Sequence, residues 1–253
     1  MTTAADATTP DPLLHNRDGR RIERVLAVMA HPDDVDFGAA GTVRQWTAAG
    51  VDVTYCLVTN GDAGGFDPDV PRSEIPAIRQ AEQRAAAAVL GVQDVRFLGY
   101  RDGELQVSHE LRRDISRVIR KARPDRMLIQ SPERNWNRIF SSHPDHMAAG
   151  DAAIQAVYPD SRNPFAHASL LLDEGLEPWS VPEVWVMAHP HPNTFIDITD
   201  VFDDKIAAIC AHASQLENPG EMRDRVAMWM GMQAQAGGLA EGRLAEAFMI
   251  VST

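Results

Sequence analysis

Two short segments combine histidine, proline and aspartate, and their residue types suit metal chemistry. The first is HPDD at 31–34 and the second is HPDH at 143–146. Two imidazoles and one carboxylate are a usual ligand set for a catalytic zinc ion that keeps an open coordination position. The set His31, Asp34 and His146 meets this requirement and would tie together two loops that lie far apart in the sequence.

The remaining polar side chains of the two segments suggest acid–base roles. Asp33 stands between two candidate ligands and could act as the general base towards a water molecule. His143 and His146 are one helical turn apart, so one of them can ligate while the other faces the substrate. We expect Asp145 to orient His143 and to raise its pKa by charge proximity.

Each segment by itself is also typical of a turn that leads into a helix capped by aspartate. The presence of both, each directly after an expected strand, favours the metal site. The glycine-rich sequence TNGDAGG at 59–65 offers a competing anion site. This alternative is weaker, because the loop lacks the lysine and spacing of phosphate-binding motifs and Asp62 would repel a phosphate.

The elements that must position these residues alternate along the chain. Apolar runs predict strands at 25–30, 51–59, 95–98, 126–130 and 184–188, and a short one at 195–198. Helical patterns are expected at 38–49, 78–90, 111–122, 146–157, 201–215 and 223–235. This order predicts one α/β domain: a Rossmann-like, doubly wound, mostly parallel sheet with helices on both faces. Its ligand would lie at the carboxyl ends of the strands.

Composition narrows the classes of protein further. The chain has 253 residues and a formal net charge of −12, which argues against binding to a nucleic-acid backbone. No apolar run reaches the roughly 18 residues that span a bilayer, and the N-terminus lacks a secretory signal. We expect a disordered tail at 1–20, a single domain at 21–253 and a cytoplasmic location. The cysteines, Cys56 and Cys210, are expected to be reduced, packed thiols.

AHPDD at 30–34 followed by HPDH at 143–146 resembles the zinc-dependent de-N-acetylases of the PIG-L/LmbE-like superfamily. That superfamily includes GlcNAc-phosphatidylinositol de-N-acetylase and deacetylases of mycothiol and bacillithiol metabolism. The resemblance covers about residues 23–217 and extends to the 59–65 loop and to an R-x-x-E-x-x-x-A-A pattern from Arg79. Taken by themselves, Arg79 and Glu82 predict a solvated ion pair on a helix, with a role in bracing the active-site loop as the alternative.

The resemblance implies roles for eight side chains. The zinc ligands would be His31, Asp34 and His146, and the sugar contacts Arg72 and Asp102. Of the catalytic groups, Asp33 would be the general base and His143 the acid and oxyanion partner, with Asp145 supporting His143. Zn²⁺ is the expected metal, and Fe²⁺ could occupy the same donors in a reducing cytoplasm. Self-association as a trimer or hexamer is also implied.

The activity expected from this resemblance is removal of an N-acetyl group from a small GlcNAc-type amino sugar by metal-activated water. One alternative is an amidase of a mycothiol-type sugar–thiol conjugate, although Ser141 stands where some mycothiol-pathway members carry tyrosine. Another is a sugar- or nucleotide-binding module without catalysis, which would need neither Asp33 nor His143. Trp136 is open to sugar contact or packing, and His189 and His191 to the pocket rim or a surface loop.

Overall fold

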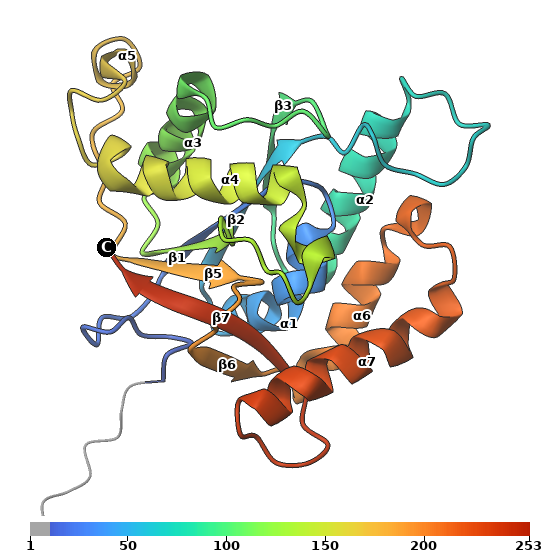
Figure 1. The fold of residues 1–253 in the computed structure, drawn as a ribbon. Helices are drawn as coiled ribbons and strands as arrows, with labels where there is room; N and C mark the ends of the chain where they lie inside the picture. Colours follow the sequence, from blue (N-terminus) through green and yellow to red (C-terminus); the bar gives the residue numbers. More distant parts are fainter. Residues whose placement is uncertain (1–10) are drawn as a thin grey trace, which may run out of the picture.

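A seven-stranded sheet forms the centre of the computed structural model, which describes residues 11–253 (Figure 1). The strand order is β3-β2-β1-β4-β5-β7-β6. The strands from β3 to β5 pair in parallel, whereas β7 is antiparallel to both of its neighbours. The strands are β1 (Arg24–Met29), β2 (Asp52–Thr59), β3 (Asp94–Tyr100), β4 (Arg126–Gln130), β5 (Glu183–Met187), β6 (Thr194–Asp197) and β7 (Ala245–Ser252).

Helices cover both faces of this sheet, as predicted. Alternate residues of β1 point to opposite sides, so Ala27 joins one apolar cluster and Val28 the other. The cluster with Ala27 is covered by α1 (Asp34–Ala48), α2 (Ile75–Val89), α6 (Phe202–Cys210) and α7 (Pro219–Ala236). The opposite face packs against α3 (His109–Ala122) and α4 (Pro144–Gln155). The expected doubly wound α/β fold is therefore confirmed.

β7 is the main element that the sequence patterns did not predict. Its second residue, Glu246, is fully buried and pairs with the buried Lys205 of α6 at 2.8 Å. Backbone amides of Gly41 and Thr42 donate to the same carboxylate. A charged residue interrupts the apolar pattern of this strand, and its compensating partners lie far away in the sequence. The short helix α5 (Ala168–Leu172) was also not predicted.

Residues 11–20 pack on the domain, contrary to the expectation of a disordered tail. The buried guanidinium of Arg126 donates to the carbonyls of Pro12, Leu13 and His15. The indole of Trp46 also donates to the Leu13 carbonyl, at 2.9 Å. The rest of the expected tail, residues 1–10, lies outside the described residues.

Two further features bear on the sequence-based expectations. Cys56 is buried as expected, whereas Cys210 is exposed at the end of α6, which corrects the expectation that both thiols are packed. Among the residues described, no helix combines the length and the apolar character needed to cross a membrane.

The topology concentrates the motif-bearing loops at one place. β1 and β4 are parallel neighbours, and the chain leaves them towards opposite sides of the sheet. In open α/β sheets this reversal opens a crevice at the carboxyl ends of the two strands. HPDD spans the turn between β1 and α1 and the first residue of α1, and HPDH spans the end of the connection from β4 and the first turn of α4.

Candidate metal centre and active site

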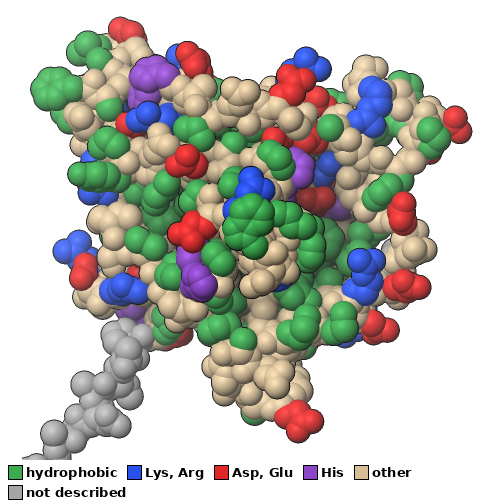
Figure 2. All heavy atoms as spheres, in the orientation of Figure 1, with side chains coloured by type: hydrophobic (Ala, Val, Ile, Leu, Met, Phe, Trp, Pro, Cys, Tyr) green, Lys and Arg blue, Asp and Glu red, His purple; other side chains and the backbone are tan. Residues whose placement is uncertain are grey.

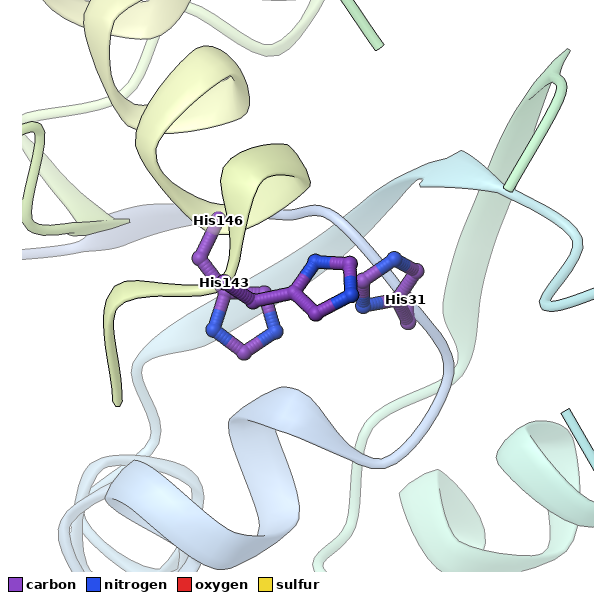
Figure 3. Close-up of side chains that lie close together, drawn as sticks. All are labelled: His31, His143 and His146. Carbon is purple, nitrogen blue, oxygen red and sulfur yellow. The ribbon is translucent and has the colours of Figure 1, made fainter. Parts of the chain in front are cut away.

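Three histidines converge at this crevice (Figure 3). His31 follows β1, His143 ends the short turn η1 (Ile139–Ser142), and His146 lies in the first turn of α4. One ring nitrogen from each lies within 4.8 Å of the others. In the space-filling view, histidine and acidic side chains are recessed among other groups near the middle of this face (Figure 2).

The Asp34 carboxylate connects two of these rings. One of its oxygens lies 3.0 Å from Nε2 of His146, and the other lies 3.5 Å from Nδ1 of His31. The structure thus brings together the three predicted ligands, with His143 beside them. Imidazole nitrogens and a carboxylate oxygen suit a borderline cation such as Zn²⁺, so these residues fit a metal site.

The second ring nitrogen of His31 faces two more carboxylates. Its Nε2 lies 3.1 Å from Asp102 and 3.1 Å from Asp145. Histidines that bind a metal through one nitrogen usually donate the other N–H to a carboxylate, which fixes the ring and its tautomer. This arrangement leaves Nδ1 of His31, on the Asp34 side, as the nitrogen available to a metal.

Asp145 lies elsewhere than the sequence pattern suggested. Its buried carboxylate contacts His31 and accepts the backbone N–H groups of Gly103 and Leu105. Its link to His143 is made by the backbone, because the Asp145 N–H donates to Nδ1 of His143 at 3.2 Å. The expected carboxylate contact with His143 is therefore replaced by a contact with His31.

The pKa values reflect these neighbours. Burial disfavours the charged form of His31, but the hydrogen bonds to Asp102, Asp145 and Asp34 outweigh it and raise the pKa of His31 to about 12. Burial, together with the charges of His31 and His146, lowers the pKa of His143. The negative charge of Asp145 acts in the expected direction on His143 but is outweighed, so the expected increase in the pKa of His143 is not found.

Asp33 occupies a distinctive position between the ligand candidates. Its φ of 91° lies in the left-handed region, and its backbone N–H donates a hydrogen bond to Oε1 of Gln83. Its carboxylate lies 3.0 Å from the guanidinium of Arg79. Burial raises the pKa of Asp33 to about 6, although the charge of Arg79 opposes this shift. A carboxylate that titrates near neutrality is well suited to accept a proton.

Arg79 is a site residue for which the favoured prediction, a solvated ion pair, differs from its position in the structure. Its side chain is buried and donates to the Pro32 carbonyl and to the Asp33 carboxylate. Glu82 does not pair with it, and instead accepts hydrogen bonds from the N–H and hydroxyl of Ser214. The expected solvated ion pair is therefore wrong. The glycine-rich loop leaves room for this side chain, since a Cβ at Gly64 would lie 2.2 Å from the Arg79 guanidinium.

A cavity of about 380 Å³ lies next to the histidine and aspartate side chains described above. Asp102 lines this cavity. Arg72 is not among the lining residues, and its guanidinium donates to the carbonyls of Asp62 and Gly64 in the loop after β2. The structure thus places one of the two predicted sugar contacts at the cavity. The charged and histidine side chains lining it are His31, Asp33, Asp34, Arg79, Asp102, His143 and His146.

The residues whose roles were open, Trp136, His189 and His191, lie in the loops after β4 and β5 and are not among the residues that line the cavity. Trp136 is 79% exposed and has the Arg134 guanidinium 5.5 Å from its ring centroid, so it is not packed in the core. His189 is half-buried, with its Nε2 3.5 Å from the Glu133 carboxylate. His191 is exposed on the same loop.

Known proteins are similar to this chain in both sequence and fold. The model of the PIG-L family, described as GlcNAc-PI de-N-acetylase, matches residues 26–157. A diacetylchitobiose deacetylase from Thermococcus kodakarensis is 37% identical over 77% of this chain and 70% of its own length. A probable N-acetyl-alpha-D-glucosaminyl L-malate deacetylase 2 from Bacillus cereus is 34% identical over 76% of this chain and 84% of its own length. The N,N'-diacetylchitobiose deacetylase structure from Pyrococcus horikoshii superposes with a TM-score of 0.84 at 32% identity, covering 91% of this chain and 84% of that one.

Proposed function

Because this chain belongs to the PIG-L family of de-N-acetylases and is an amide hydrolase, we propose that it removes the N-acetyl group of a small GlcNAc-type sugar. One observation carries the proposal for the site. The carboxylate of Asp33 lines the same cavity as His31, Asp34 and His146. A proton acceptor and a metal-binding set therefore face one bound molecule.

We assign His31, Asp34 and His146 as the residues that hold the metal, with Zn²⁺ as the expected ion and Fe²⁺ as an alternative. When bound, a divalent cation of this kind supplies Lewis-acid chemistry, acidifying water and polarising an acyl oxygen. Asp102 and Asp145 hold the His31 ring through its Nε2. We expect loss of this support to weaken metal binding by about 10–100-fold.

Asp33 would act as the general base. Its carboxylate accepts a proton from the attacking water, and its pKa of about 6 leaves it mostly ionised at neutral pH. Hydroxide adds to the acetamide carbon, and the C–N bond then breaks as Asp33 returns the proton to the amine nitrogen. The products are acetate and a free amino sugar.

His143 would stabilise the oxyanion that develops during the reaction. Its ring centroid lies 5.1 Å from that of His31 and 5.2 Å from that of His146, at the edge of the cavity. Nδ1 of His143 accepts the backbone N–H of Asp145, so the proton of a neutral ring resides on Nε2. That N–H can donate to the oxyanion of a tetrahedral intermediate.

The cavity also limits the part of the substrate that is enclosed. Its volume of about 380 Å³ is near the lower end for small-molecule pockets, so it suits one amino-sugar unit. Asp102 and the buried Arg79 offer an acceptor and a donor for sugar hydroxyls at its wall. Arg72 would contribute through the loop that it holds, because its guanidinium is bound to backbone carbonyls.

We further propose that residues 11–253 form a single domain, which works in the cytoplasm and assembles as a homo-oligomer such as a trimer or hexamer. Support for self-association comes from apolar side chains exposed on η1 and α7. These are Ile139, Phe140, Met228 and Met232, which are between 53% and 73% exposed. Burying such side chains in a subunit contact would be favourable.

The function is tested by metal analysis combined with an acetate-release assay. Elemental analysis would give the metal content of the purified protein, and acetate would be measured with N-acetylglucosamine and N,N'-diacetylchitobiose as substrates. We expect about one metal ion per chain and acetate release that a chelator abolishes. A metal-loaded protein without turnover of these acetamides would move the search to sugar–thiol conjugates. A folded protein that binds no metal would overturn the proposal.

A further inference from the structure

The backbone at Asp33 needs external support. Its φ of 91° lies in the left-handed region, which residues with a side chain rarely adopt. Such a conformation persists where surrounding contacts fix it, and it is concentrated at functional sites. The direction of the Asp33 carboxylate depends on this backbone. The groups that hold the backbone therefore determine where the proposed base points.

Gln83 of α2 provides a direct contact to this backbone. Its Oε1 accepts the N–H of Asp33 at 2.8 Å, and its side chain is fully buried. Arg79 lies one turn earlier on the same helix face and donates to the Pro32 carbonyl and to the Asp33 carboxylate. One face of α2 thus holds both the main chain and the side chain of the base.

The Gln83 amide can hold Asp33 in only one orientation. Its Nε2 donates to a carboxylate oxygen of Asp36 at 2.8 Å. A carboxylate accepts hydrogen bonds, so a flipped amide would set oxygen against oxygen at Asp36 and N–H against N–H at Asp33. The same Asp36 oxygen lies 2.9 Å from Nε2 of His212, and both side chains are fully buried.

We propose that Gln83 is a positioning residue for Asp33, and that Asp36, held by His212, sets the direction of its amide. The chain of contacts runs from the turn after α6 through the first turn of α1 to α2 and back to the turn after β1. The role in catalysis rests on the proposed function of Asp33 as the base. The hydrogen bonds themselves can be tested without an activity assay.

Two variants test this proposal. Gln83→Met removes both hydrogen bonds while it keeps the length of the side chain. The double substitution Gln83→Glu/Asp36→Asn exchanges the amide and the carboxylate, so an acceptor again faces the Asp33 N–H and a donor again joins positions 83 and 36. The neutral His212 ring then takes the tautomer whose Nε2 accepts from the amide introduced at position 36. The matched control is Gln80→Met on the same helix, because the Gln80 amide donates to Asn60 and not to Asp33.

The measurements are kcat and KM for acetamide hydrolysis, metal content, and the hydrogen-exchange rate of the Asp33 amide by NMR. For Gln83→Met we expect kcat to fall by about 10–100-fold, since small displacements of a reacting group are costly. KM and metal content should change little, and exchange at Asp33 should accelerate at least about tenfold, because its buried hydrogen bond is lost. The double substitution should recover most of both losses, and the control should leave both unchanged.

Several outcomes would overturn the proposal. One is a folded, metal-loaded Gln83→Met enzyme with the kcat of the wild type. Another is a folded double variant in which exchange at Asp33 stays fast. If Gln83→Met fails to fold, Gln83→Asn, which withdraws the amide by one methylene, should give the same kcat loss and faster exchange, and wild-type values would refute the role. A wild-type enzyme that hydrolyses no acetamide would refute the proposed function, while exchange at Asp33 would still decide whether Gln83 holds that amide.

Discussion

The carboxylate of Asp145 lies 3.1 Å from Nε2 of His31, although 114 residues separate them. This contact joins the start of α4 to the turn after β1. It also accounts for the burial of Asp145, whose oxygens are further satisfied by the amides of Gly103 and Leu105. A residue in the HPDH segment thus supports a proposed metal ligand in the HPDD segment.

Replacing Asp145 by asparagine should therefore weaken metal binding. The variant keeps the shape of the side chain but loses the charge that orients the His31 ring, so we expect metal affinity to fall by about 10–100-fold. Competition with a chromophoric chelator would measure this. Asp151→Asn, on the same helix, is the control and should keep wild-type affinity. Unchanged affinity with a reduced kcat would instead favour the original expectation that Asp145 acts on His143.

Asp33→Asn should separate catalysis from metal binding. Asparagine tolerates the left-handed conformation at this position, so the backbone should be retained. Because an amide cannot accept a proton from water, kcat should fall by about 10²–10⁴-fold. Metal content and the circular dichroism spectrum should match the wild type. Loss of metal in this variant would show that Asp33 is a ligand and not the base.

The positions of β1 and β4 could be predicted because both strands are buried on both faces and read as short apolar runs. The proposed metal set could be predicted with them, since His31 and Asp34 lie in the turn after β1 and at the start of α1, and His146 lies in the helix that follows β4 in the chain. Arg79 could not be placed, because helical periodicity does not show that the glycine loop leaves room for a buried guanidinium. The direction of Asp145 was missed because backbone amides from the loop after β3 fix it.

The two thiols should react very differently in the folded protein. Burial raises the pKa of Cys56 to about 12, so it holds almost no thiolate at pH 8. Cys210 is exposed. We expect a disulfide reagent to modify one thiol per native chain and two after denaturation. Cys210→Ser should abolish the native reaction, and rapid modification of Cys56 in that variant would contradict the described burial.

Asp160 should contribute stability that disappears in acid. Burial opposes its ionisation, but hydrogen bonds from Arg112 and His167 dominate and lower the pKa of Asp160. A lowered pKa means that the stabilisation is complete above the unfolded value near 4 and is lost as the pH falls through the folded value. At pH 7, Asp160→Asn should lower the free energy of unfolding by about 2–3 kcal/mol.

The test is urea unfolding at several pH values. The difference between wild type and Asp160→Asn should be constant from pH 6 to 8 and should shrink below about pH 4. Asp173→Asn is the control, because Asp173 is exposed on the neighbouring segment. A difference that persists unchanged in acid would mean that the ionised carboxylate is not the source of the stability.

Gly150 controls how closely α4 approaches the sheet. A Cβ at this position would lie 2.2 Å from the backbone oxygen of Gln130, and backbone cannot rotate away as a flexible side chain can. Gly150→Ala should therefore push α4 off the end of β4 and destabilise the fold by about 1–3 kcal/mol. His146 lies one turn earlier on this helix, so metal affinity should fall together with stability. Gly231→Ala in α7 is the matched control, since its Cβ would meet only one atom, at 4.0 Å, and alanine favours the helix by about 1 kcal/mol. Thermal unfolding and metal titration of both variants measure the two effects. A stable Gly150→Ala protein with wild-type metal affinity would show that the placement of His146 does not depend on this close contact.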